Sequence, residues 1–334
     1  MKKMKPWMKL VLSVFIFILL VFGVTLTYTF YQLSKINTIK ISKTDEDLGI
    51  KPEVTLKKEL PIKKEVPIIK EVPIKIEETI KKEDSYKIIN IAFFGVDRTD
   101  VNQPSRSDSI MILSIDEKNN KIKISSIMRD TYVKIKNHGE TKINHAYAYG
   151  GPQLTIRTLN ENLNLDIRDY VMVDFSNFAK IIDAIGGITI DVKQDEISSI
   201  PQIIKPGLQT LNGLQAVEYS RIRNTAGDDF RRTERQRTVL SVMLTKIQSL
   251  GVMEFPSVVS KLLPFTETSM NSMDIIKLGT KVFTSNIKTL EQERFPLDGY
   301  WTGKTIGGVW YLVADMKATV DQLHKFIYED IKLN

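Results

Sequence analysis

The sequence contains no cysteine and only three histidines among its 334 residues. The absence of cysteine excludes disulfides, a thiol nucleophile and a zinc site with cysteine ligands. Three histidines, His138, His145 and His324, are enough in number for a metal site. We interpret each instead as an ordinary hydrogen-bonded or solvated side chain. A chain without disulfides is compatible with an extracytoplasmic location and does not require one.

Residues 86–334 also lack a large excess of positive charge. The formal net charge is +7 and the isoelectric point is about 9.2. Residues 1–85 carry 16 lysines and 11 acidic residues, which leaves 31 basic and 29 acidic residues for 86–334. A broad binding surface for a phosphate backbone is therefore not expected, and we predict no nucleic-acid partner.

Arginine is absent from the first 90 residues. All twelve arginines follow, and six of them fall within residues 221–237. The planar guanidinium group matches phosphate and carboxylate oxygens in a bidentate manner, which a lysine ammonium does not. This concentration of arginine indicates an anion-binding site, although the nearly balanced net charge of residues 86–334 does not.

Charged residues are absent from residues 10–34, which makes that run long enough to span a bilayer as a helix. Four lysines precede the run, which by the positive-inside rule keeps the N-terminus in the cytoplasm. A cleaved signal peptide is the alternative, but the run is long for one and no small-residue cleavage pattern follows it. We expect a cytoplasmic tail at 1–9, a transmembrane anchor at 10–34 and everything after it outside the cell membrane, in a single-pass topology.

Residues 35–85 are rich in lysine and glutamate and include a repeat of six residues, seen as KKELPI, KKEVPI and IKEVPI. Proline in each copy favours an extended, polyproline-like chain, and the three copies would span on the order of 55 Å. We expect 35–85 to be an extracellular linker. It is either a stalk that holds the domain off the membrane or a spacer without specific reach.

Residues 86–334 show the mixed periodicities of an α/β protein. We predict one layered α-β-α domain around a mixed central sheet, behind the N-terminal transmembrane helix. Strands are expected at 86–97, 109–116 and 120–128, with a hairpin between the last two. A strand, a helix and a second strand are expected within 170–192, a strand or strand end at 214–223, and a late strand at 290–298. Helices are expected at 151–164, 228–250, 255–263, 273–283 and 317–331.

Opposite charges occur together where three of these elements begin or end. Arg106 and Asp108 start one strand, Arg129 and Asp130 follow another, and the stretch DDFRRTERQR opens a helix. One explanation is a set of ordinary salt bridges. The other is an anion site, in which arginines bind phosphates while Asp97 and Asp108 bind a divalent metal, because Mg²⁺ prefers a few carboxylates together with substrate phosphates.

Several ordered stretches make the sequence similar to the LytR-CpsA-Psr family, which consists of membrane-anchored phosphotransferases of bacterial cell-wall assembly. The similar stretches cover mainly residues 86–240. They are NIAFFGVD, RSDSIMILSID, SIMRDTYVKI, KINHAYAYGG, DFSNFAKIIDAIGGITIDV, LNGLQAVEYSRIR and DDFRRTERQR.

This resemblance implies an enzyme that moves a glycopolymer, such as teichoic acid or capsule, from an undecaprenyl-pyrophosphate carrier to peptidoglycan. By position, Asp97 and Asp108 correspond to Mg²⁺ ligands, and Arg106, Arg129 and Asp130 to catalytic residues. The residues that would bind the pyrophosphate are Arg106, Arg129, Arg221, Arg223, Arg232 and Gln236. Asp130 and Asp229 are candidates for the general base or acceptor contact, and for Asp130 we favour a role in orienting Arg129.

Two questions stay open. Apolar residues at helical spacing, Phe175 and Phe178 on one helix and Leu240 on another, are most simply core residues, but a slot between these helices would suit a polyprenyl chain. The same site also suits a lipid-pyrophosphate hydrolase, which needs no acceptor, or a non-catalytic module that binds anionic polymers. The sequence does not identify the glycopolymer or the oligomeric state.

Overall fold

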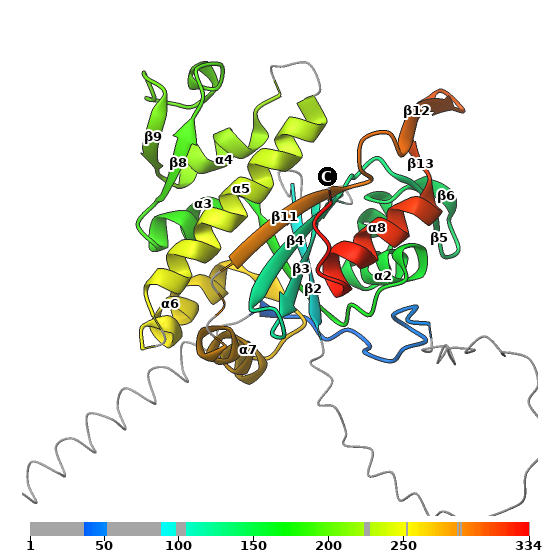
Figure 1. Ribbon diagram of the computed structural model, residues 1–334, viewed down its shortest axis with the longest axis horizontal. Helices are drawn as coiled ribbons and strands as arrows, with labels where there is room; N and C mark the ends of the chain where they lie inside the picture. The colour runs from blue at the N-terminus through cyan, green and yellow to red at the C-terminus, as the bar shows by residue number, and fades with distance from the viewer. Residues whose placement is uncertain are drawn as a thin grey trace, which may run out of the picture.

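A seven-stranded mixed sheet forms the centre of the computed structural model (Figure 1), which describes residues 37–51, 88–97, 105–223, 228–251, 253–285, 287 and 289–333. In spatial order the strands are β1 (Asn37–Thr38), β10 (Glu267–Thr268), β7 (Asp169–Asp174), β2 (Ile89–Val96), β3 (Ser107–Asp116), β4 (Lys121–Ile127) and β11 (Thr289–Phe295). Strands β2, β3 and β4 are antiparallel neighbours, whereas β7 runs parallel to β2 and β11 runs parallel to β4.

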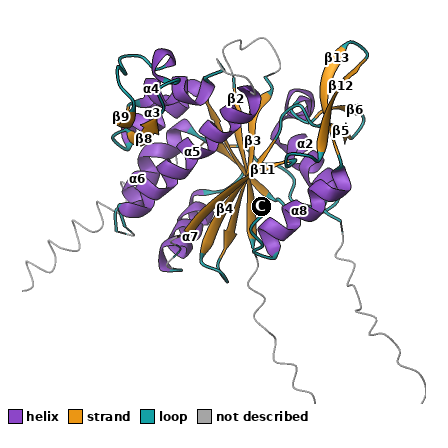
Figure 2. Ribbon diagram, turned by 45° about the horizontal axis from the view of Figure 1, so that its top comes forward, coloured by secondary structure: helices purple, strands orange, loops and turns teal. Residues whose placement is uncertain are grey.

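Helices cover both faces of this sheet, as Figure 2 shows. Successive strand residues point to opposite faces, so Phe94 packs on one side and Phe93 on the other. One face is covered by α2 (His145–Leu163) and α8 (Met316–Tyr328). The other face is covered by α3 (Phe175–Ala184), α4 (Gly213–Arg221), α5 (Asp228–Ser249), α6 (Phe255–Leu262) and α7 (Ser272–Thr284). The prediction of a layered α/β domain around a mixed sheet is confirmed.

Three short hairpins extend from the layers. Two short 3₁₀ helices, at Ile197–Ser199 and Leu263–Phe265, complete the connections. The hairpins are β5 (Tyr132–Ile135) with β6 (Gly139–Lys142), β8 (Ile188–Val192) with β9 (Gly207–Leu211), and β12 (Trp301–Ile306) with β13 (Val309–Ala314). The strand expected at the end of 170–192 is β8, whereas neither β9 nor the β12–β13 hairpin was expected.

The expected strand or strand end at 214–223 is wrong, because this stretch is mostly the helix α4. Asn212 begins the helix with a capping box, in which its side chain accepts from the Gln215 amide while the Gln215 side chain accepts from the Asn212 amide. Such a reciprocal pair satisfies two amides at the helix start, and it outweighs the strand preference of the Val217–Tyr219 stretch.

The expected linker at 35–85 includes residues that belong to the domain, so a domain start at residue 86 is too late. Asn37 and Thr38 form β1, which pairs with β10, and the Leu48 side chain is fully buried in the core beneath α2. The amide of Asn160 also donates to the Leu48 carbonyl oxygen at 2.9 Å. Residues 37–51 therefore dock before the repeats begin, and the chain rejoins the sheet at β2.

The repeats themselves and the expected anchor at 10–34 lie outside the described residues. Within the described ranges, no helix has the length and apolar character needed to cross a membrane.

Candidate active site

Charged residues from three neighbouring strands meet at one edge of the sheet. Asp97 follows β2, Asp108 lies at the start of β3, and Arg129 follows the end of β4. Because β3 runs antiparallel to both neighbours, its first residues lie beside the last residues of β2 and β4. This edge is where α/β sheets commonly bind their ligands.

A polar cavity of about 370 Å³ opens at this edge, a volume in the usual range of ligand sites. The end of α4 and the first turns of α5 supply its other wall. Its lining consists of Asp97, Asp108, Phe175, Arg221, Arg223, Arg232 and Gln236. Six of these seven residues are ones that the sequence analysis selected, so the structure brings most of the expected site together.

Arg129 is held among three carboxylates beside the cavity. Its guanidinium pairs with Asp108 through Nη1, with Asp229 through Nη2 at 3.3 Å and with Asp130 through Nε at 3.7 Å. Burial lowers the pKa of Arg129, but the three carboxylates raise it more, so the net pKa lies above its ordinary value. Arg129 is therefore a fixed cation, oriented by groups on β3, on α5 and on its own loop.

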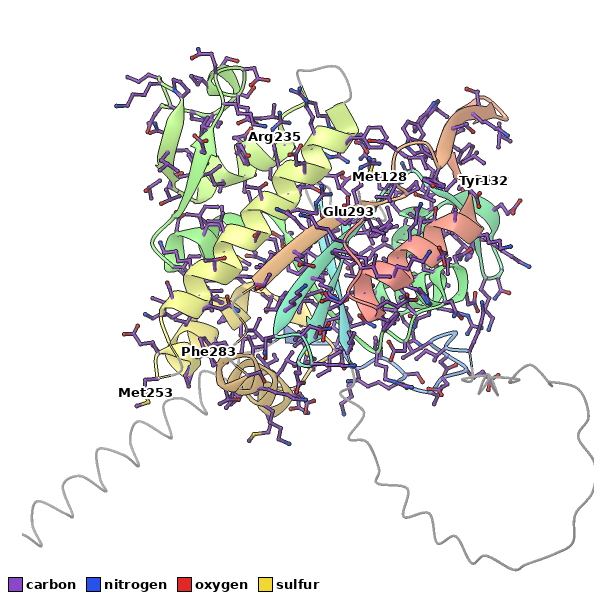
Figure 3. The ribbon with its side chains drawn as sticks, in the orientation of Figure 1. Met128, Tyr132, Arg235, Met253, Phe283 and Glu293 are labelled. Atoms are coloured by element: carbon purple, nitrogen blue, oxygen red, sulfur yellow. The ribbon has the colours of Figure 1, made fainter. Side chains whose placement is uncertain are left out.

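The end of β4 is fixed by packing as well as by charge. Met128, labelled in Figure 3, is buried, and its sulfur accepts a contact from the Thr233 hydroxyl of α5 at 3.7 Å. The Met128 amide donates to the Phe295 carbonyl of β11 at 3.0 Å. Arg129 consequently leaves the sheet from a rigid position.

Arg232 lies at the back of the cavity, with its side chain only 3% exposed. Its Nη2 binds Asp229 Oδ1 at 2.8 Å, whereas its Nε has no hydrogen-bond partner among the described residues. Burial and then the positive charge of Arg129 lower the pKa of Arg232 to about 10. An anion in the cavity would compensate both effects, because it would supply the missing acceptor and a negative charge.

The two candidate bases are both ion-paired. Asp130 Oδ1 binds Lys142 Nζ at 2.7 Å, and its other oxygen faces Arg129. Asp229 Oδ1 is shared by Arg129 and Arg232, while Asp229 Oδ2 has no hydrogen-bond partner within the described ranges. The geometry supports a positioning role for both carboxylates, and Oδ2 of Asp229 is the oxygen with remaining capacity to accept a proton.

Of the other expected cations, Arg221 and Arg223 line the polar cavity and Arg106 does not. The Arg221 guanidinium lies over the Phe175 ring, 4.9 Å from its centroid, and Arg223 is exposed at the cavity mouth. Arg106 is exposed and is not among the residues that line the cavity. Burial, followed by the charges of Arg106 and Lys142, lowers the pKa of His145, so Arg106 lies on the α2 side of the site.

Asp97 and Asp108 line the same cavity and could contribute oxygen ligands to one metal ion. No cluster of three or more histidine, aspartate or glutamate residues suited to a metal occurs in the described part of the chain. Two carboxylates together with substrate phosphate oxygens and water fit Mg²⁺, which rarely has a complete protein cage. The donor set therefore fits this metal and does not fit a site made of protein ligands alone.

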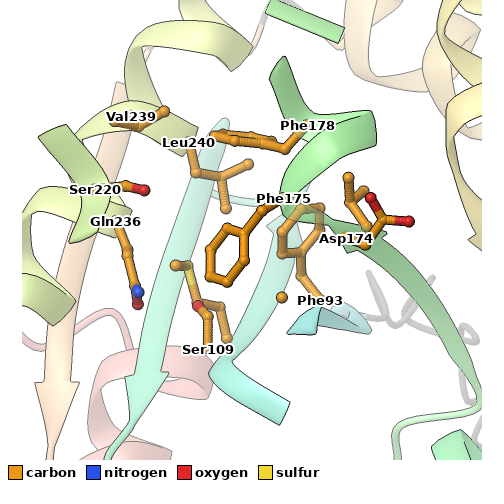
Figure 4. Close-up of a pocket in the computed structure, with 12 residues that line it drawn as sticks. Phe93, Ser109, Asp174, Phe175, Phe178, Ser220, Gln236, Val239 and Leu240 are labelled. Atoms are coloured by element: carbon orange, nitrogen blue, oxygen red, sulfur yellow. The ribbon is translucent and has the colours of Figure 1, made fainter. Parts of the chain in front are cut away.

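A second, apolar cavity adjoins the polar one (Figure 4). Its volume is about 50 Å³, and it shares Phe175 and Gln236 with the polar cavity. In Figure 4 the rings of Phe93, Phe175 and Phe178 point toward its interior. Phe175, Phe178 and Leu240 line a narrow slot, whereas Ile181 and Ile182 of the same helix are buried core.

Sequence reasoning did not anticipate the wall residue Phe175 in the polar cavity. The sequence does contain a signal for this residue, because an aromatic residue directly after Asp174 begins a helix at the same edge of the sheet. Side-chain capping of α3 by Asp174, which accepts from the Asn177 amide at 2.8 Å, fixes where that ring emerges.

The chain was compared with protein families and with known proteins. The LytR_cpsA_psr family model matches residues 55–326. The regulatory protein MsrR of Staphylococcus aureus (strain COL) is 36% identical over 194 residues, which are 57% of this chain and 59% of that protein. The chain thus spans less than two thirds of MsrR. The polyisoprenyl-teichoic acid–peptidoglycan teichoic acid transferase TagU of Oceanobacillus iheyensis is 33% identical over 235 residues, covering 67% of this chain and 71% of that protein.

Among solved structures, B. subtilis TagT matches with a TM-score of 0.61 and 27% identity, over 76% of this chain and 95% of that one. A structure of TagT bound to LI-WTA matches with the same TM-score and identity, over 74% of this chain and 91% of that one. These likenesses extend over nearly the whole of the described domain.

Proposed function

The chain belongs to the LytR_cpsA_psr family, and we propose that it is a phosphotransferase that attaches a glycopolymer of teichoic-acid or capsule type to peptidoglycan. The donor in this proposal is the glycopolymer linked to undecaprenyl pyrophosphate. The transferase name of TagU and the structure of TagT with LI-WTA support a function of this class.

One observation carries the proposal: an arginine-lined polar cavity opens directly beside an apolar one. A lipid pyrophosphate has the same two halves, a strongly anionic head and an apolar chain. Arg221, Arg223 and Arg232 would bind the head, and Arg129 lies beside them. The apolar slot with Phe93 and Phe178 would receive the first part of the chain, because burial there removes apolar surface from water.

In the proposed reaction, a muramic-acid hydroxyl attacks the phosphorus nearest the sugar. A new oxygen–phosphorus bond forms, the bond from that phosphorus to the bridging oxygen breaks, and undecaprenyl phosphate leaves with the bonding electrons. The hydroxyl proton passes to a base that we do not identify, for which Asp229 and Asp130 are the residues to test. The polymer thereby becomes joined to peptidoglycan through a phosphodiester.

The protein's contribution to this reaction is positioning and charge stabilisation, as in other phosphoryl transfers. Arg129 and Arg232 are fixed by shared carboxylates before the substrate binds, so they need little reorganisation as charge develops on the phosphoryl and leaving oxygens. Gln236 can donate an amide hydrogen bond to the same oxygens.

We further propose that Asp97 and Asp108 hold one Mg²⁺ together with the pyrophosphate. When bound, the metal would neutralise charge on the phosphate oxygens and fix their orientation. Asp108 would then have two tasks, because it also orients Arg129.

The location of the protein follows the same proposal. An anchor at 10–34 with a cytoplasmic N-terminus would hold the domain on the outer side of the cell membrane, where both the lipid carrier and peptidoglycan are available. Because residue 37 already pairs in the sheet, the domain would lie close to the membrane surface.

A transfer assay tests the proposal. The full-length protein in detergent is incubated with a short-chain lipid-pyrophosphate oligosaccharide, Mg²⁺ and peptidoglycan fragments, and the products are followed by mass spectrometry. We expect glycan linked to the acceptor, dependent on metal, and lost in Arg129→Ala and Asp108→Ala. Arg231→Ala is the matched control, since Arg231 is the neighbour of Arg232 on α5 but pairs with Asp195 away from the cavity. Equal activity of Arg129→Ala and Arg231→Ala would contradict the proposal.

Two alternatives make different predictions in the same assay. A lipid-pyrophosphate hydrolase would release lipid at the same rate with and without peptidoglycan. A non-catalytic module that binds anionic polymer, consistent with the regulatory name of MsrR, would bind the donor without turnover and would not need both Asp97 and Asp108.

A further inference from the structure

Exposed apolar side chains gather on the β12–β13 hairpin. Gly307 and Gly308, both with positive φ, form its turn, and the hairpin extends from the top of the molecule in Figure 1. Trp310 is 45% exposed, and Ile306 and Val309, which pair at the tip on the opposite face, are 41% and 42% exposed. Large exposed apolar groups on a rigid element commonly mark a binding surface.

The Trp310 indole packs against Gly303 of the opposite strand. A methyl group built on Gly303 would lie 2.8 Å from Trp310 Nε1, so the indole occupies the space that any other side chain at position 303 would need. Trp310 pairs with Thr305 across the hairpin, and Trp301, Gly303 and Thr305 alternate onto the same face. We name Trp301, Gly303 and Trp310 the aromatic face of the hairpin.

The aromatic face is continuous with the candidate active site. The Trp301 ring lies 4.9 Å from the ring of Phe230, and Phe230 directly follows Asp229, which pairs with Arg129. The Leu312 amide of β13 also donates to the Asp130 carbonyl at 3.0 Å. The hairpin therefore contacts Phe230, the neighbour of Asp229, and also contacts Asp130. Asp229 and Asp130 both pair with Arg129.

From this continuity we propose that the aromatic face binds the glycan chain of the acceptor, peptidoglycan, and so aligns its hydroxyl with the donor phosphorus. A flat, exposed indole suits a saccharide, because the C–H bonds of a sugar ring carry partial positive charge and stack on the negative face of the aromatic ring. This inference rests on the proposed function.

The direction of attack favours the acceptor over the donor glycan as the occupant. In phosphoryl transfer the attacking and leaving oxygens lie roughly in line with the phosphorus. The leaving lipid phosphate would depart toward the apolar cavity, which lies among α3, α4 and α5. Figure 2 shows the β12–β13 hairpin on the other side of the sheet edge, where an acceptor must enter.

The position of the hairpin also argues against a membrane contact. The N-terminal segment, blue in Figure 1, lies at the bottom of the molecule beside α7, whereas the hairpin lies at the top. With an anchor that ends at residue 34 and a chain that pairs in the sheet from residue 37, the end of the domain near that segment would face the bilayer. The hairpin would then face the cell wall.

Co-sedimentation with peptidoglycan tests the proposal. Full-length protein in detergent is mixed with purified sacculi stripped of attached polymers, and the bound fraction is measured for the unaltered protein and for Trp310→Ala. We expect roughly five- to tenfold weaker binding, the size of one aromatic stacking contact. Leu208→Ala on the β9 hairpin is the control, because Leu208 is 76% exposed and distant from the active site.

A second variant keeps the indole and displaces it. Gly303→Ala places a methyl group where the ring lies, so we expect weaker binding to sacculi although every aromatic residue is present. Unchanged binding of both Trp310→Ala and Gly303→Ala would overturn the proposal. So would a loss of binding to anionic phospholipid vesicles with no loss of binding to sacculi, because that result would assign the hairpin to the membrane.

The experiment separates this inference from the proposed function. If Arg129-dependent transfer is observed but Trp310→Ala changes neither sacculus binding nor the acceptor KM, the inference fails and the function stands. If sacculus binding depends on Trp310 but no donor is transferred, the glycan-binding face stands and the proposed function fails.

Discussion

Asp229 joins the two most buried arginines of the site through a single carboxylate oxygen. Oδ1 binds Arg129 at 3.3 Å and Arg232 at 2.8 Å. A carboxylate oxygen shared by two guanidinium groups holds both of them in place, which suits an orienting role. The assignment of its role can be decided by the pH dependence of the reaction.

For Asp229→Asn we expect kcat/KM to fall by about tenfold or more at every pH, because both arginines lose the group that positions them. The amide keeps the shape of the side chain, so the pH profile should keep its form. The measurement is the transfer rate across the pH range over which the protein stays folded. If the acidic limb of the profile disappears in this variant, Asp229 is the general base and the positioning role is wrong.

Arg237 is a buried cation outside both cavities. Its side chain is 8% exposed, and its Nε and Nη1 have no hydrogen-bond partner in the part of the chain that the structure describes. Burial lowers its pKa to about 10, and the attraction of Glu293 does not fully offset this effect. A basic group whose pKa falls on folding destabilises the fold at every pH below that value.

We therefore expect Arg237→Gln to raise the free energy of unfolding at pH 7 by about 1 kcal/mol, because it removes a buried and poorly compensated charge. Urea denaturation followed by circular dichroism measures the change. Arg235→Gln is the contrasting control, since Arg235 binds Glu196 at 2.7 Å in a buried pair and its replacement should destabilise. A loss of stability in Arg237→Gln would show that the attraction between Arg237 and Glu293 outweighs the cost of burying the charge.

At the residue scale, sequence reasoning located most of the site. Asp97, Asp108, Arg221, Arg223, Arg232 and Gln236 line one cavity because the ends of adjacent strands and helices meet there. Arg106 was grouped with them and does not line the cavity. Arg106 precedes β3 by one residue, beside the irregular register between Gly95 and Val96. The sequence does not show where such an irregularity falls, and it changes which residues face the site.

At the scale of elements, close packing of α3 against α4 builds the wall of the apolar cavity. Gly213 begins α4, and a methyl group on it would lie 2.1 Å from the Ala179 carbonyl oxygen of α3. The backbone of one helix would have to move to accommodate it. We expect Gly213→Ala to destabilise the protein by about 1–3 kcal/mol, measured by thermal or urea unfolding.

The neighbouring residue supplies the control for that prediction. Leu214 is 57% exposed, so Leu214→Ala should change stability little. If Gly213→Ala is equally neutral, the two helices are not packed as closely as described and the shape of the apolar cavity would need revision.

Elements with a regular period were predicted correctly, and those fixed by local hydrogen bonds were not. The buried strands β2, β3 and β4 and the helix α5 follow from their apolar patterns. The capping box at Asn212 made α4 a helix against its strand-like composition. The β12–β13 hairpin was missed although Gly307 and Gly308 stand between two runs of strand-forming residues, a recognised hairpin signal.

At the scale of the whole molecule, the N-terminal segment 37–51 changes where the domain begins. Residues 37–51 are part of the fold, so the repeats of the expected linker come after a docked segment and before β2. Composition alone placed all of 35–85 in one linker, because two paired residues and one buried leucine leave little trace in a lysine- and glutamate-rich stretch. The repeats therefore do not lie between the expected anchor and the first paired residue of the domain.

Leu48→Ala tests the docking of that segment. Leu48 is fully buried in the core beneath α2, so we expect a loss of roughly 2–5 kcal/mol in the free energy of unfolding. Ile39→Ala, at a 40% exposed position of the same segment, should be nearly neutral. Equal effects of the two substitutions would mean that the segment does not contribute to the core.

The most direct test of the central claim follows the phosphorus atom nearest the sugar. The lipid-pyrophosphate oligosaccharide is prepared with a radioactive label on that phosphorus only, and the protein, Mg²⁺ and peptidoglycan are added. The account predicts that the label appears in peptidoglycan as a phosphodiester, that unlabelled lipid monophosphate is released, and that Arg129→Ala abolishes both. Label in free sugar phosphate, or label that stays on the lipid while sugar is transferred, would contradict it.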